Sequence, residues 1–199
     1  MPADLARKAE KLNLYVLWFR HGLGLAIVLG LAAYQGFSHS QIGLTLRGWQ
    51  PNALIGIGAS ALQLGFQRLF WRPYPLFNDN HKHLAAEPRA NWILSQLFSV
   101  FAEELWLAFC VVSLIRAGHS SLLAILLPAT VFGALHYPYR AGAIGTGVNG
   151  AISASLFLWR GSLLPSYLFH YMGNIACLYW ACRGTASARR KSLGRTTLN

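Results

Sequence analysis

The sequence predicts an all-α fold: a polytopic integral membrane bundle of about six transmembrane helices, in one domain over residues 1–199. Hydrophobic residues make up 54% of the chain and charged residues 12%, whereas a soluble domain carries roughly 25% charged residues. Apolar stretches recur along the chain, and each transmembrane helix needs about 20 apolar residues. The basic residues are also distributed between the connections as membrane topology requires.

We expect the helices over residues 14–36, 52–70, 91–115, 120–135, 141–159 and 163–182. The first resembles a signal peptide in position, but Arg20 and His21 interrupt its apolar stretch and further spans follow. We therefore interpret it as a retained membrane helix. The fourth helix is short. The fifth is rich in small residues at four-residue spacing, such as Ala143 and Gly147, which let helices approach closely in lipid. We expect this helix in the centre of the bundle, with Asn149 as an interhelical hydrogen bonder.

The net charge of +11 does not indicate nucleic-acid binding, because the basic residues follow topology instead of gathering on one face. With the N-terminus inside, the inner segments hold 13 of the 17 Lys and Arg residues and Arg20 lies within the first span. The outer loops hold the other 3, which are Arg47, Arg116 and Arg160. This bias fits the positive-inside rule and predicts that both the N- and the C-terminus are cytoplasmic.

Polar segments flank and connect these spans. We expect residues 1–12 to form a charged amphipathic segment on the cytoplasmic surface and residues 183–199 to form a basic cytoplasmic tail. The connection 71–90 is interpreted as a solvated loop and not as a metal site, because alternate loop residues have no fixed geometry. Its candidate ligands would be Asp79, His81 and His83. The cysteines lack metal-ligand spacing and are expected to pack as small apolar residues; they are Cys110, Cys177 and Cys182.

Two adjacent acids, Glu103 and Glu104, lie in the middle of the apolar stretch 91–115, whereas the other four acids lie in polar segments. A carboxylate at bilayer depth costs at least ~2.5–3.5 kcal/mol, so an intramembrane acid indicates a functional site by default. Neighbouring helical residues point about 100° apart. We therefore expect one glutamate to face the site and the other to be held by a second partner.

Two histidines and an asparagine accompany the glutamates in later spans. His136 ends the fourth span four residues after Phe132, and His170 precedes Asn174 by four residues in the sixth. Residues four apart share a helix face, so each pair points together. Each residue alone is compatible with a helix–helix hydrogen bond. Together they supply a general base, a proton partner and an oxyanion clamp for water attack on a peptide carbonyl.

At these positions the chain resembles the CAAX-processing endopeptidase and bacteriocin-processing family (CPBP, also called Abi). Glu103-Glu104, Phe132-xxx-His136 and His170-xxx-Asn174 occur in the order and spacing of that family, and the similarity covers residues 91–182. It implies an intramembrane endopeptidase whose catalytic core is this segment. The implied substrate is a membrane-anchored protein or peptide, cleaved near its C-terminus.

The resemblance implies that Glu103 activates water, that His136 assists it and that His170 with Asn174 stabilises the oxyanion, while Glu104 positions these groups. The family has been described both as zinc-dependent and as metal-free. We favour the metal-free reaction without a cofactor, because Glu103, His136 and His170 as zinc ligands would leave no separate base unless Glu104 served. A zinc-dependent protease using the same residues is the alternative.

One position departs from the family pattern. The first motif usually reads Glu-Glu-xxx-Arg, but Ala108 stands in place of the arginine. We hypothesise that Arg20 supplies the missing cation to Glu104 from the first helix; otherwise Arg20 extends to the cytoplasmic surface. Ala108 also favours a different class, a non-catalytic immunity or scaffold membrane protein. A proton-coupled transporter fits the intramembrane acids but not the lack of internal repeats.

Overall fold

The computed structural model describes residues 3–70, 90–136, 141–177 and 179. Its helices are α1 (Ala3–Tyr34), α2 (Trp49–Phe70), α4 (Ala90–Arg116), α5 (Ser121–Leu135), α6 (Ala141–Arg160) and a last helix over residues 163–177. Every regular element in the described ranges is a helix, which confirms the all-α class. α1 is unbroken from Ala3 to Tyr34 and therefore includes most of the predicted amphipathic segment and of the first predicted span. The predicted tail, residues 183–199, lies outside the described residues.

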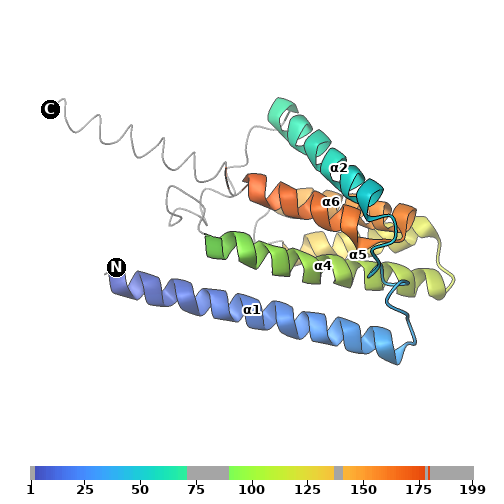
Figure 1. The fold of residues 1–199 in the computed structure, drawn as a ribbon, viewed down its shortest axis with the longest axis horizontal. Coiled ribbons are helices and arrows are strands. Elements are labelled where there is room, and N and C mark those ends of the chain that lie inside the picture. The colour runs from blue at the N-terminus through green and yellow to red at the C-terminus, as the bar shows by residue number, and fades with distance from the viewer. Residues whose placement is uncertain (1–2, 71–89, 137–140, 178, 180–199) are drawn as a thin grey trace.

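The helices lie side by side and alternate in direction along the chain (Figure 1). α1 packs along α4, α4 also contacts α5 and α6, and α5 and α6 pack against each other. Repeated crossing of one bilayer requires such an alternation. The arrangement therefore agrees with the predicted topology, although the number of spans and the cytoplasmic location of the termini stay predictions.

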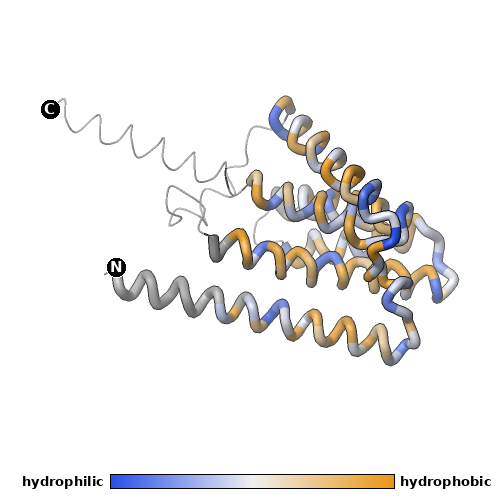
Figure 2. The backbone as a smooth tube through the Cα atoms, viewed as in Figure 1, coloured by the Kyte–Doolittle hydropathy of each residue, from blue (hydrophilic) through white to orange (hydrophobic). Residues whose placement is uncertain are grey.

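The surface carries many large apolar side chains, including Leu62 and Ile144, which are 78% and 71% exposed. Figure 2 shows apolar residues along most helices and a hydrophilic stretch midway along α1. By length and composition, one segment of the described chain is able to cross a membrane, Ile93–Arg116 in α4. Shorter apolar segments are Trp18–Tyr34 and Ser121–Leu135. An apolar surface of this extent fits contact with lipid better than contact with water.

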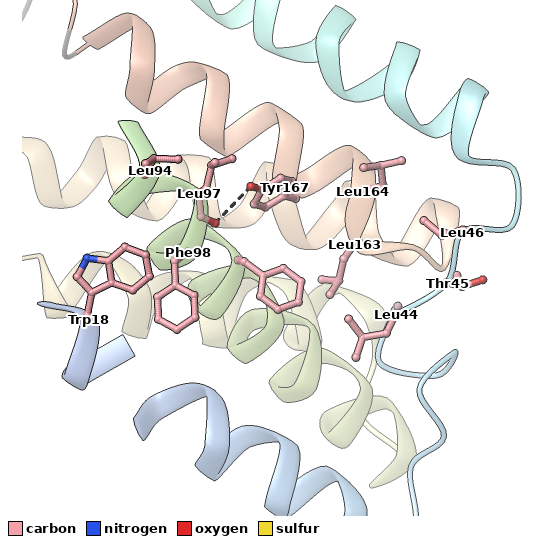
Figure 3. A pocket seen from close by; sticks show the side chains of 12 residues that line it. Trp18, Leu44, Thr45, Leu46, Leu94, Leu97, Phe98, Leu163, Leu164 and Tyr167 are labelled. Atoms are coloured by element: carbon pink, nitrogen blue, oxygen red, sulfur yellow. Dashed lines mark hydrogen bonds between the residues drawn. The ribbon is translucent and has the colours of Figure 1, made fainter. Parts of the chain in front are cut away.

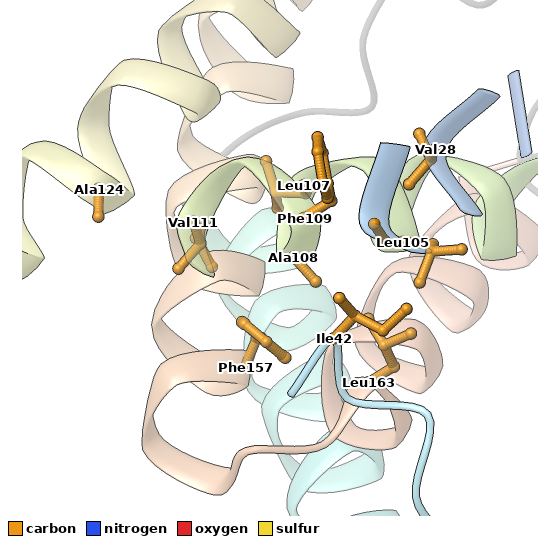
Figure 4. Packing of buried hydrophobic residues seen from close by; sticks show 12 residues of the cluster. Val28, Ile42, Leu105, Leu107, Ala108, Phe109, Val111, Ala124, Phe157 and Leu163 are labelled. Atoms are coloured by element: carbon orange, nitrogen blue, oxygen red, sulfur yellow. The ribbon is translucent and has the colours of Figure 1, made fainter. Parts of the chain in front are cut away.

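The hydrophobic core joins α1, α4, α5, α6 and the start of the last helix (Figure 4). Ile42, from the connection after α1, packs in the same cluster as Leu105 and Phe157. The connection is fixed in place because the amide of Leu163 donates to the carbonyl oxygen of Gly43 over 3.0 Å. Gly43 has a φ of 81°, and a Cβ there would lie 2.9 Å from the Leu163 nitrogen, so glycine is required. This contact positions the helix that carries two of the predicted site residues.

Small residues bring α5 and α6 into backbone contact, as the sequence predicted. A Cβ at Gly133 would lie 2.7 Å from the carbonyl oxygen of Ala143, and one at Gly150 would lie 3.2 Å from the Phe132 ring. The predicted role of Asn149 is also confirmed, because Gln63 Nε2 on α2 donates to Asn149 Oδ1 over 2.8 Å. Among the cysteines, Cys110 packs against the core, in agreement with its predicted role.

The contact of α2 with the last helix predicts opposite effects for two neighbouring glycines. A Cβ at Gly56 would lie 2.6 Å from the Pro165 carbonyl oxygen, whereas one at Gly58 would meet nothing within 4 Å. We expect Gly56→Ala to destabilise the fold by roughly 1–3 kcal/mol through overpacking. Gly58→Ala should be neutral or stabilising by up to about 1 kcal/mol. Thermal unfolding of the detergent-purified variants measures both, and equal shifts would contradict the close packing of α2.

Candidate active site

The two adjacent glutamates of α4 have different environments, as expected from their positions on the helix. Glu104 is buried, with a side chain that is 3% exposed, whereas the Glu103 side chain is 24% exposed. Glu104 points into the contact between α4, α6 and the last helix. The exposures of the two side chains agree with the expectation that the glutamates differ in their surroundings, while the assignment of one of them to the site stays a prediction.

The Glu104 carboxylate is held through a single oxygen. Ser153 Oγ, on α6, donates a hydrogen bond to Glu104 Oε1 over 3.0 Å. His170 Nδ1, on the last helix, lies 2.8 Å from the same oxygen. Three helices thus meet at one carboxylate oxygen. A buried carboxylate needs such donors, because burial removes its hydration.

His170 lies between the two carboxylates. Its Nδ1 atom is bonded to Glu104, and its Nε2 atom lies 3.7 Å from Glu103 Oε2. The second distance is longer than a hydrogen bond but short enough for a strong electrostatic interaction. When Nδ1 donates its proton to Glu104, the bond to Glu104 also sets the direction of the Nε2 edge, which faces Glu103.

His136 joins this group through the aromatic ring of Phe132. His136 caps the C-terminus of α5, and its Nδ1 atom lies 2.8 Å from the Phe132 carbonyl oxygen. The centroid of the Phe132 ring lies 4.9 Å from that of His136 and 5.9 Å from that of His170. The predicted proximity of Phe132 and His136 is confirmed. The same ring packs against both histidines, which lie on different helices.

Asn174 lies one turn beyond His170 and contacts α4 about two turns before Glu103. Its Nδ2 atom donates to Gln96 Oε1 over 2.9 Å. Both His170 and Asn174 therefore contact α4, as expected for residues on one helix face. Gln96 and Ser153 contact the predicted site residues, and neither was predicted from the sequence. Gln96 precedes Glu103 by seven residues, which places the two on the same side of α4 and was an available signal.

The predicted compensation of Glu104 by Arg20 is not what the structure shows. Arg20 Nη2 bonds to His21 Nε2 over 3.2 Å, and the bonds to Glu104 come from Ser153 and His170. Ala108 is 1% exposed and lies in the hydrophobic core with Ile42 (Figure 4). Hydrogen-bond donors on two other helices therefore hold the carboxylate, while the position of the expected arginine is filled by packing.

A metal site does not emerge from the described part of the chain. No group of three or more His, Cys, Asp or Glu side chains among these residues is arranged to hold a metal ion. The zinc alternative built on Glu103, His136 and His170 therefore has no assembled ligand set. The candidate ligands of the connection after α2, Asp79, His81 and His83, lie outside the described residues.

An apolar pocket of about 740 Å³ is lined by residues of α1, of the connection after α1, of α4 and of the last helix (Figure 3). Its lining is almost wholly apolar and includes Trp18, Leu97 and Phe101, and its polar edge is Tyr167, whose hydroxyl donates to the Leu97 carbonyl oxygen over 3.3 Å. Phe101 precedes Glu104 by three residues and Tyr167 precedes His170 by three, so two of the lining residues each lie about one helical turn from a member of the polar group.

Part of the chain matches a known protein family. Residues 85–176 match the family model described as type II CAAX prenyl endopeptidase Rce1-like. The matched segment contains all five predicted site residues, Glu103, Glu104, His136, His170 and Asn174. No curated protein matched the chain, and no solved structure did. The family match confirms the resemblance that the three motifs carried.

Proposed function

Because residues 85–176 match the family model of Rce1-like type II CAAX prenyl endopeptidases, we propose that this chain is an intramembrane endopeptidase. It hydrolyses a peptide bond of a membrane-anchored protein or peptide, near the C-terminus of that substrate. The observation that carries the proposal is the arrangement of His170 between a buried and a partly exposed carboxylate, 2.8 Å from Glu104 and 3.7 Å from Glu103.

Glu103 is the general base in this proposal. Its carboxylate is the more exposed of the two, so a water molecule and a peptide are able to approach it. Oε1 of Glu104 accepts a hydrogen bond from Ser153 and faces His170. Glu104 is therefore less available as a base, and we assign it the role of holding His170 in position. A base must lie within hydrogen-bonding reach of the proton that it removes.

The proposed reaction gives each of these groups one role. Glu103 takes a proton from water, and the hydroxide attacks the carbonyl carbon of the scissile peptide bond. His170 and Asn174 donate hydrogen bonds to the oxyanion that forms, and His136 assists in positioning the water. Collapse of the tetrahedral intermediate breaks the C–N bond, and the leaving amine takes the proton from Glu103.

No metal takes part in the proposed reaction. In this scheme Glu103 acts as a base and not as a ligand. A zinc-dependent reaction is the alternative, and it predicts loss of activity on treatment with a chelator and recovery with Zn²⁺. The metal-free reaction predicts unchanged activity under the same treatment.

The apolar pocket receives the group that anchors the substrate in the membrane. An apolar chain in this pocket would bring the attached peptide toward Glu104 and His170, since two of the lining residues each lie about one helical turn from one of them. The protein itself crosses the membrane several times, with both termini in the cytoplasm and the lipid bilayer as its environment. The alternating helix directions and the excess of basic residues on the inner segments support this topology.

Cleavage of a lipidated peptide by the purified protein in liposomes tests the function. The probe is a farnesylated peptide that ends in Cys-aliphatic-aliphatic-X, with mass spectrometry of the products. We expect cleavage by the wild type and a loss of about 100-fold in kcat for His170→Ala, which removes an oxyanion donor. Undiminished biological activity of His170→Ala, together with no cleavage by the wild type, would support the scaffold or immunity role instead.

A further inference from the structure

Ser153 makes a hydrogen bond that the other helical hydroxyls near it do not make. Ser155, on the same helix, donates to the Ala151 carbonyl oxygen over 2.7 Å, and Thr130 on α5 donates to the Leu126 carbonyl oxygen over 2.7 Å. Such bonds to the carbonyl four residues earlier are common for Ser and Thr within helices. Ser153, which is 1% exposed, instead donates across the helix contact to Glu104.

The bond from Ser153 fixes more than one group. It ends on Oε1 of Glu104, the oxygen that also faces His170 Nδ1. A carboxylate held at one oxygen by a fixed hydroxyl cannot rotate freely, so the direction in which it presents that oxygen to His170 is set. The imidazole ring in turn presents its Nε2 edge toward Glu103, 3.7 Å away.

We propose that Ser153 is a positioning residue of the active site, which acts through Glu104 on the orientation of His170. The expected effect on catalysis rests on the proposed function, whereas the orientation of Glu104 and His170 by Ser153 does not. The Ser153 hydroxyl orients the buried Glu104 carboxylate and adds no charge to the site. Neither the sequence motifs nor the family match identifies Ser153 by itself.

Removal of the hydroxyl has a defined expected effect. In Ser153→Ala, Glu104 keeps His170 as a partner but loses the donor that fixes its oxygen. We expect kcat to fall by about 10- to 100-fold, since small misplacements of catalytic groups cost up to about 100-fold. KM should change little, because Ser153 lies in the helix contact and not among the pocket-lining residues. The pH dependence of kcat should also change, because the environment of the Glu104–His170 pair changes.

The experiment compares three variants of the full-length protein. Ser153→Ala removes the donor, Ser153→Thr keeps a hydroxyl, and Ser155→Ala is the matched control on the same helix. The readouts are kcat, KM and pH profile with the farnesylated peptide, and the ring N–H resonance of His170 in NMR spectra, assigned by its loss in His170→Gln. We expect Ser153→Ala to change kcat, the pH profile and the resonance. Ser153→Thr should recover most of kcat, and Ser155→Ala should leave all the readouts unchanged.

The NMR measurement keeps this inference separate from the proposed function. A wild type that cleaves nothing would overturn the proposed function, yet a shifted His170 resonance confined to Ser153→Ala would still support the positioning contact. An unchanged resonance in Ser153→Ala would overturn the inference even if the wild type cleaves the peptide. Equal changes in Ser153→Ala and Ser155→Ala would assign both serines to general packing of α6 and would also overturn it.

Discussion

Replacing Glu103 by glutamine is expected to abolish peptide cleavage while leaving the fold intact. The amide has the shape of the carboxylate but does not take a proton from water, so kcat should fall by about 10³- to 10⁴-fold. Stability should change little, because the Glu103 side chain is 24% exposed and its charge interaction with His170 spans 3.7 Å. Initial rates with the farnesylated peptide and thermal unfolding of the same preparation measure the two effects.

Substitution of the neighbouring Glu104 is the control, because we expect it to reduce stability, whereas Glu103→Gln reduces activity. Glu104→Ala removes a buried acceptor and leaves Ser153 Oγ and His170 Nδ1 without their partner. Breaking a buried pair in this way costs on the order of 3 kcal/mol. We therefore expect a clear drop in unfolding temperature for Glu104→Ala and none for Glu103→Gln. If Glu104→Ala were stable and inactive while Glu103→Gln stayed active, the roles of base and support would have to be exchanged.

The sequence predicted the fold well because the signals for helices in lipid are local. Long apolar stretches set the helices, and their ends in the structure lie within a few residues of the predicted spans for α2, α4, α5 and α6. The four-residue spacing of Phe132 and His136 likewise predicted a contact within one helix. Such expectations need only the period of the helix and no knowledge of its neighbours.

The partners of Glu104 were not predictable in the same way. Ser153 appeared in the sequence as one small residue of a small-residue helix, and nothing in its spacing distinguished it from Ser155. Which hydroxyl meets the carboxylate depends on the rotation of α6 against α4, which only the tertiary structure sets. The hypothesis about Arg20 named the wrong glutamate for a similar reason. The bonds to Glu104 come from Ser153 and His170, whereas Arg20 interacts electrostatically with the neighbouring Glu103.

The second large effect is expected at the apolar pocket. Leu97→Trp replaces a leucine side chain by a larger indole ring in the wall of the 740 Å³ pocket, between Leu94 and Phe101 on the same face of α4. If the ring excludes about five methylene groups of the anchoring chain, the lost burial amounts to ~4 kcal/mol. That loss corresponds to about 10³-fold in kcat/KM. The rate with the farnesylated peptide in liposomes measures it.

Two comparisons decide whether the loss arises in the pocket. The same peptide without its farnesyl group gains nothing from the pocket, so Leu97→Trp should leave its slow cleavage unchanged. Leu122→Trp makes the same substitution at an exposed leucine of α5, outside the pocket, and should leave both rates unchanged. An equal loss for both peptides would indicate damage to the catalytic group. Full activity of Leu97→Trp on the farnesylated peptide would show that the anchoring chain binds elsewhere, so only a loss confined to that peptide supports the pocket as its binding site.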